Sequence, residues 1–145
     1  MIMKVKEYLS QAIWLDQRIN SKLEQLEILR ALAMRVTTNL TEQKVSGGNN
    51  VKSSMEKTVT KIIDLEKEIN EDIDRLVSLK ADIMETISKI NDPICQLLLE
   101  MRYINGKTWD EVAMDLGFDR RWVLRLHGGA LKEIEEKMKY ATKSH

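Results

Sequence analysis

Two adjacent arginines, Arg120 and Arg121, are the side chains of this sequence whose type and position best suit a chemical task. They follow Asp119, a residue type that favours the position before the first turn of a helix. Arginines at the start of a helix have the geometry to donate paired hydrogen bonds to the edge of a guanine when that helix enters the major groove of DNA. The pair therefore predicts base-specific contacts with DNA.

The residues around the arginines predict a helix-turn-helix that would position them. Thr108 and Glu111 have the spacing of a capping box at the start of a first helix. Gly117 can adopt a positive φ and end that helix, and Asp119 can cap the second one. The predicted core of the motif consists of the apolar residues at helical spacing together with the glycine of the turn. These residues are Val112, Ala113, Leu116, Gly117, Phe118, Val123 and Leu126.

Five side chains near the motif are candidate contacts to DNA phosphates, namely Lys107, Thr108, Trp122, His127 and Lys132. They must act as a local patch, because 23 Lys and Arg residues balance 23 Asp and Glu residues and leave no net charge to attract nucleic acid. The indole of Trp122 has three open interpretations, which are contact with a sugar-phosphate strand, contact with a protein, or packing onto the long helices described below. Gly128 and Gly129 allow either close packing or a bend of the second helix.

The stretch from Thr108 to Ile134 resembles region 4 of the bacterial sigma-70 factors, from its threonine and acidic opening through the glycine turn to an Ala-Leu-Lys sequence. The segments YINGKTWDEVAMDLGF and RLHGGALKEI are also similar to the ArpU and RinA type of transcription regulators from phages and prophages of Gram-positive bacteria. This resemblance implies base-reading roles for Arg120, Arg121 and Arg125. Sigma factors usually carry an acidic residue at the position of Arg121 and glutamine at that of Arg125, so the DNA sequence that they read does not carry over.

Two long heptad segments precede the motif and predict a helical hairpin. The first, over residues 4–36, is interrupted once by Lys22 in an otherwise apolar seam. The second, over residues 55–91, has apolar residues at strict intervals of seven, namely Met55, Ile62, Ile69, Leu76, Ile83 and Ile90. The polar residues 37–54 around Gly47 and Gly48 predict a flexible loop that lets the helices fold back antiparallel. Their apolar stripes are too wide for one hairpin to bury, which predicts a dimer or higher homo-oligomer.

Asp92 and Pro93 predict the start of another helix, which Asn105 and Gly106 would end. This helix would support the helix-turn-helix and complete a trihelical unit with Trp109 in its core. The predicted fold class is thus all-α. A long antiparallel coiled-coil hairpin over residues 1–91, with the flexible loop 37–54 and an oligomerising role, precedes a helix-turn-helix DNA-binding domain over residues 92–145.

These features predict a sequence-specific transcriptional regulator that binds double-stranded DNA as an oligomer in the bacterial cytoplasm, with RNA polymerase as a further candidate partner. The resemblance implies that it is encoded by a phage or prophage. Two alternatives stay open, a packaging protein like the small terminase subunit of phages and an adaptor that binds RNA polymerase without contacting DNA. No paired carboxylates, activated nucleophile or metal-ligand cluster indicates an enzyme, a metal or another cofactor. The lone Cys95 fits a small core residue, and no stretch approaches the ~20 apolar residues of a membrane span.

Overall fold

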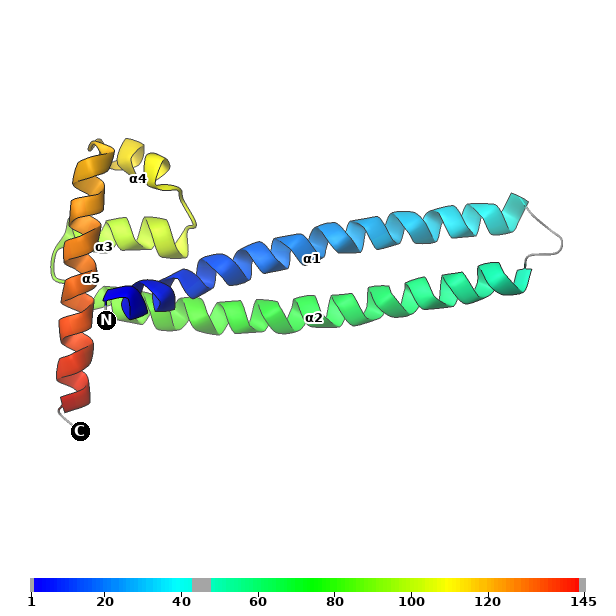
Figure 1. The fold of residues 1–145 in the computed structure, drawn as a ribbon, viewed down its shortest axis with the longest axis horizontal. Helices are drawn as coiled ribbons and strands as arrows, with labels where there is room; N and C mark the ends of the chain where they lie inside the picture. Colours follow the sequence, from blue (N-terminus) through cyan, green and yellow to red (C-terminus); the bar gives the residue numbers. More distant parts are fainter. Residues whose placement is uncertain (1, 43–47, 144–145) are drawn as a thin grey trace. The chain divides into compact units, whose positions relative to one another are not determined.

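The computed structural model describes residues 2–42 and 48–143, and these residues form helices and turns without any strand (Figure 1). The elements in order are α1 (Ile2–Glu42), α2 (Gly48–Ser88), α3 (Pro93–Leu99), the π-helical turn η1 (Glu100–Ile104), α4 (Trp109–Leu116) and α5 (Arg120–Lys143). The predicted all-α class is confirmed. Over the described ranges, none of the helices is both long enough and apolar enough to cross a membrane.

The first two helices are longer than the heptad pattern predicts. Residues 37–42 belong to α1 and residues 48–54 to α2, so the predicted loop over 37–54 is wrong at both ends. Its middle, residues 43–47, lies outside the described residues. The hydroxyls of Thr37 and Thr38 each donate to a carbonyl four residues earlier, at 2.9 Å, so these polar side chains are satisfied without leaving the helix. A polar composition alone is therefore a poor guide to where a helix ends.

The chain divides into two compact units, one containing residues 16–75 and the other containing residues 1–15 and 76–145. In the first unit, contacts between α1 and α2 join Lys22 to Asp72 and Arg30 to Glu66. As the residue number rises along α1, the number of its partner falls along α2, so the two helices run antiparallel within this unit (Figure 1). Their facing sides bury Ile19, Leu26 and Ile69.

Lys22 is paired inside this interface. Its Nζ donates to Oδ2 of Asp72 at 2.6 Å, and Asp72 is only 4 % exposed. The guanidinium of Arg75 lies 3.6 Å from the other carboxylate oxygen of Asp72. The hydrogen bond from Lys22 holds the pKa of Asp72 below its usual value, against the opposing effect of burial. The interruption of the heptad at Lys22 is thus matched by a second interruption at Asp72, fifty residues later.

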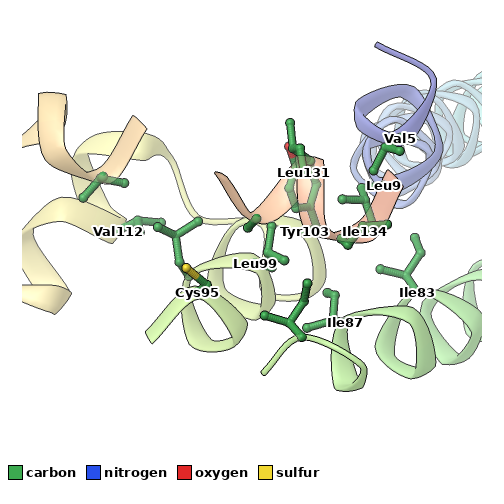
Figure 2. Close-up of a cluster of buried hydrophobic side chains, with 14 of the residues drawn as sticks. Val5, Leu9, Ile83, Ile87, Cys95, Leu99, Tyr103, Val112, Leu131 and Ile134 are labelled. Carbon is green, nitrogen blue, oxygen red and sulfur yellow. The ribbon is translucent and has the colours of Figure 1, made fainter. Parts of the chain in front are cut away.

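The second unit is built around one apolar cluster to which every one of its helices contributes (Figure 2). The start of α1 and the end of α2 bring Leu9 and Ile83, both fully buried. The buried residues that the C-terminal helices supply are Cys95, Leu98, Leu99, Tyr103, Val112, Ala113, Val123, Ala130, Leu131 and Ile134. Cys95 is buried in this cluster, as its apolar surroundings in the sequence predict. The ends of the long helices therefore belong to the same core as α3 to α5.

The sequence predicts a functional boundary at residue 91, whereas the contacts divide the chain after residues 15 and 75. The functional boundary stays a prediction. The apolar seam of α2 continues through Ile87 and Ile90 into the core of the second unit, because the same heptad that faces α1 also faces α3 and α5 there. Asp92 caps α3 as predicted, since its carboxylate accepts from the backbone N–H of Ile94 at 2.8 Å and Pro93 occupies the first helical position.

Candidate nucleic-acid interface

The local signals predicted at both ends of α4 are confirmed. The hydroxyl of Thr108 accepts from the backbone N–H of Glu111 at 3.2 Å, and the Glu111 carboxylate accepts from the backbone N–H of Thr108 at 3.3 Å. Gly117 ends the helix with φ 72° and ψ 28°, a left-handed conformation that favours glycine. Asp119 then caps α5, because its carboxylate accepts from the backbone N–H of Trp122 at 2.8 Å. The chain turns between α4 and α5 within three residues, 117–119.

The predicted core residues of this α4–turn–α5 segment differ in burial. Val112, Ala113 and Val123 are buried in the cluster of the second unit. The side chains that pack partly against that cluster are Leu116, Phe118 and Leu126. Gly117 is exposed, so its contribution is to the turn and not to packing. The two helices are thus held against α3 and η1 by their inward residues, and the side chains on the outer face of α5 are left exposed.

A polar and aromatic cluster connects α5 to η1 and α4. The Nε2 atom of His127 lies 2.6 Å from the hydroxyl of Tyr103, and its ring packs edge-on against Trp109 with 4.5 Å between centroids. The guanidinium of Arg102 lies 4.9 Å from the centre of the Trp109 ring and donates to the carbonyl of Lys107 at 2.9 Å. These contacts anchor the middle of α5 to the segment that precedes α4. Trp109 is partly buried in the core, as the sequence predicts.

The prediction that His127 contacts a phosphate has no support in this structure, because the His127 side chain is only 6 % exposed. Burial, with smaller contributions from Lys6 and Arg102, lowers the pKa of His127 to about 4. Burial also raises the pKa of Tyr103 to about 12. The phenol is therefore protonated and the imidazole neutral near pH 7, and the hydroxyl donates to Nε2. A neutral, enclosed imidazole is a structural support and carries no charge to a phosphate.

The face of α5 opposite the core carries an exposed cationic row. Arg121, Arg125 and Lys132 are four and seven residues apart, so at 100° per residue they share one side of the helix. Val123 and Ile134 lie on the opposite side and are buried. Across residues 2–42 and 48–143 no hydrogen bond or ion pair engages the three cationic groups. The structure therefore brings together two of the predicted base-reading arginines with one predicted phosphate contact.

The other predicted contacts are arranged differently. Arg120 lies on the side of α5 that faces α4, with its guanidinium 3.4 Å from the carboxylate of Asp110. The ammonium of Lys107 is paired with Asp115 at 2.5 Å. Thr108 uses its hydroxyl as the cap of α4. These three residues are exposed or partly exposed, but each already has a partner within the chain.

Trp122 borders the cationic row and is 47 % exposed. It is absent from the apolar cluster formed by the described residues of its unit. The structure thus gives no support to packing onto the long helices, and contact of the exposed indole with DNA or with a protein stays a prediction.

Gly128 and Gly129 are not required by packing within this chain. A Cβ atom at either position would meet no atom within 4 Å among the described residues, and α5 continues through both. Since glycine is a poor helix former, we expect Gly128→Ala and Gly129→Ala each to raise the free energy of unfolding by roughly 0.4–1 kcal/mol. Denaturant titrations followed by circular dichroism measure this effect. A fall in stability would show instead that α5 must approach another surface closely at these residues.

Sequence reasoning missed the role of Tyr103 and the burial of His127. The signal for His127 is present, because it stands four residues after Val123 and three before Ala130 and so shares their inward face. The partner of a buried histidine has no such local signal, since Tyr103 precedes it by 24 residues. Among the described residues, no three His, Cys, Asp or Glu side chains gather as a metal site requires.

Comparison with known proteins gives one family match. The family model described as "Protein of unknown function (DUF1492)" matches residues 34–135, which include the end of α1, all of α2, α3, η1 and α4, and the exposed cationic row of α5. No curated protein and no solved structure matches this chain.

Proposed function

The chain belongs to the family described as Protein of unknown function (DUF1492), and we propose that it is a sequence-specific DNA-binding transcriptional regulator. In this proposal α4 and α5 form a helix-turn-helix, and α5 is the recognition helix that enters the major groove. The observation that carries the proposal is the row of Arg121, Arg125 and Lys132 on the side of α5 that faces away from the core, where none of the three is paired with another described residue.

The dimensions of this row suit a major groove. At 1.5 Å per residue, Arg121 and Lys132 are about 16 Å apart along α5, somewhat more than the groove width of about 12 Å. The two arginines can therefore reach base edges while Lys132 meets a phosphate at the border of the groove. Gly128 and Gly129 lie between Arg125 and Lys132 and have no side chains. The DNA backbone can therefore approach α5 closely at these two residues.

Affinity for DNA must arise from this face alone, because the whole chain has no net charge. Over residues 119–132 four arginines and lysines stand against one aspartate. We propose that the antiparallel α1 and α2 act as a coiled-coil hairpin that joins copies of the chain, so that two recognition helices act together on one site. The regulator then acts on transcription in the cytoplasm of a bacterial host, with RNA polymerase as its further partner.

Replacing Arg121 and Arg125 together by alanine tests the proposal. If each arginine makes a paired contact worth about 1–3 kcal/mol, the double variant should lose at least about 30-fold in affinity for the selected site. The site is first selected from a random duplex library, and affinity is then measured by fluorescence anisotropy at fixed salt. Arg18→Ala with Arg35→Ala is the matched control, because it removes the same charge from exposed arginines of α1 and should leave the affinity unchanged.

Two further variants separate the roles within the row. Lys132→Ala should weaken binding to all duplexes alike and lower the slope of log affinity against log salt by about one. Arg120→Ala should have a smaller effect than Arg121→Ala, because Arg120 is paired with Asp110 on another side of α5. Selection that enriches no sequence, or equal losses from the double variant and its control, would reject DNA recognition by α5.

A second candidate function is supported by the exposed apolar residues at the start of α5. Trp122 and Leu124 are 47 % and 42 % exposed, and such side chains are typical of a protein contact. An adaptor that binds RNA polymerase through this end of α5 would retain polymerase binding in the arginine double variant and lose it in Trp122→Ala. The regulator loses DNA binding in the first of these variants.

A further inference from the structure

Within the unit formed by residues 16–75, the two sides of α2 that flank its contact with α1 are chemically opposite. Between residues 57 and 75, six residues of α2 lie on one of these sides, and all six are charged. They are Lys57, Lys61, Asp64, Glu68, Glu71 and Arg75. On the other side Val59, Ile63 and Ile73 are exposed by 41–59 %. The charged side is typical of a helix surface that faces solvent. The exposed apolar stripe, on a helix with a heptad pattern, is typical of a surface that packs against another helix.

α1 extends the apolar side. Arg30 pairs with Glu66, which lies on the same side of α2 as Val59 and Ile73, so this pair marks where the two helices adjoin. Leu23 and Met34 stand seven residues before and four residues after Arg30, which places them on its side of α1, and both are exposed. We call this surface the Arg30 face, and it consists of the exposed or partly exposed residues Leu23, Glu27, Arg30, Met34, Val59, Ile63, Glu66, Asn70 and Ile73.

The charges at the centre of the Arg30 face make it complementary to itself. Arg30 Nη2 lies 2.9 Å from Glu66 Oε1, and both side chains remain about half exposed. Leu23 and Ile73 lie on one side of this pair along the helices, and Met34, Val59 and Ile63 lie on the other. A two-fold axis parallel to the helices, lying between the two faces, would bring Arg30 against Glu66 of the second copy and would place each apolar group on the same group of the second copy. In most homodimers the interface is formed in this way, by the same surface of both copies.

We propose that the Arg30 face binds the Arg30 face of a second copy of this chain and that the four helices form a two-fold symmetric bundle. The occupant is a second copy because the central cation and anion balance each other and each finds its opposite in another copy of the same surface. DNA is excluded as the occupant by the lack of an excess of positive charge on this face. The inference rests on the oligomeric part of the proposed function and does not depend on the DNA contacts of α5.

A pair of matched substitutions tests which side of α1 and α2 forms the interface. Ile63, on the Arg30 face, and Ile28, on the other side of α1, are almost equally exposed, at 59 % and 60 %. Sedimentation and light scattering of the full chain should give a dimer for the wild type and for Ile28→Glu. Ile63→Glu should raise the dimer dissociation constant at least tenfold, with helix content unchanged by circular dichroism. A monomeric wild type, or dissociation caused by Ile28→Glu and not by Ile63→Glu, would overturn the proposal.

Charge reversal separates contacts between copies from contacts within one chain. Arg30→Glu and Glu66→Arg should each weaken self-association at least tenfold, because each variant brings like charges together across the axis. An equal mixture of the two variants should form a heterodimer, because the carboxylate introduced in one variant then meets the guanidinium introduced in the other. A pair that acts only within its own chain gives no recovery on mixing, and that result would also overturn the proposal. A monomer that still binds its selected DNA site would reject this interface while leaving the DNA-binding part of the proposed function intact.

Discussion

Replacement of Lys22 by alanine is expected to lower the free energy of unfolding by about 3–5 kcal/mol, because it leaves the buried carboxylate of Asp72 without its main partner. Asp72 is 4 % exposed, and its closest cationic contact is the Lys22 ammonium at 2.6 Å. The guanidinium of Arg75, 3.6 Å away, is largely exposed and can offset only part of the loss. Urea titrations at equal chain concentration measure the change, since self-association would otherwise alter the apparent stability.

The matched control is the double variant Lys22→Leu with Asp72→Leu. Replacing both charges by apolar residues removes the interaction and its desolvation cost together, so its stability should equal or exceed that of the wild type by up to about 4 kcal/mol. The buried ion pair then serves to fix the register of α1 against α2, and the double variant should lose the unique pairing before it loses helix content. A loss below about 1 kcal/mol for Lys22→Ala would mean that Asp72 is hydrated and the pair contributes little.

The pKa of Asp72 gives this pair a defined pH dependence. Its folded-state pKa is lowered below its ordinary value of 3.8, chiefly by the hydrogen bond from Lys22. The stabilisation is therefore complete above about pH 4 and is lost as the pH falls through the folded-state pKa. Lys22→Ala should remove this acid-sensitive contribution along with the pair.

The second large effect is expected at His127. Its pKa is about 4 in the folded chain and near 6.5 when unfolded, so between these values the unfolded state binds a proton that the folded state does not. Stability should be unaffected by this group above about pH 6.5 and should fall by about 3 kcal/mol as the pH drops to about 4. Thermal unfolding at half-unit steps of pH measures the slope.

His127→Gln tests the assignment. The amide cannot titrate, so the slope contributed by His127 between about pH 6.5 and pH 4 should disappear even though the variant is less stable at neutral pH. Tyr103→Phe should keep most of the slope, because burial is the main cause of the lowered pKa, and should cost about 1 kcal/mol through the lost hydrogen bond. Parallel curves for the wild type and His127→Gln would show that His127 is solvated in the folded protein.

The α4–α5 segment shows how far local sequence signals reach. The caps at Thr108, Gly117 and Asp119 depend on residues only a few positions apart, and all three are found where the spacing predicts them. The same holds for Asp92 and Pro93 at the start of α3. The roles of Arg121 and Arg125 in binding DNA stay predictions, but their grouping on one face follows from helical geometry alone.

The sequence by itself determined that this protein is helical, where its short C-terminal helices begin, and which face of α5 is apolar, because these properties depend on neighbours within one or two turns. The tertiary structure alone decided that Lys22 is paired with Asp72, that His127 is enclosed by Tyr103 and Trp109, and that Arg120 is drawn toward Asp110 and away from Arg121. Each of these outcomes depends on the free-energy cost of burying or pairing a polar group. That cost is fixed by partners up to 50 residues away, which no local pattern specifies.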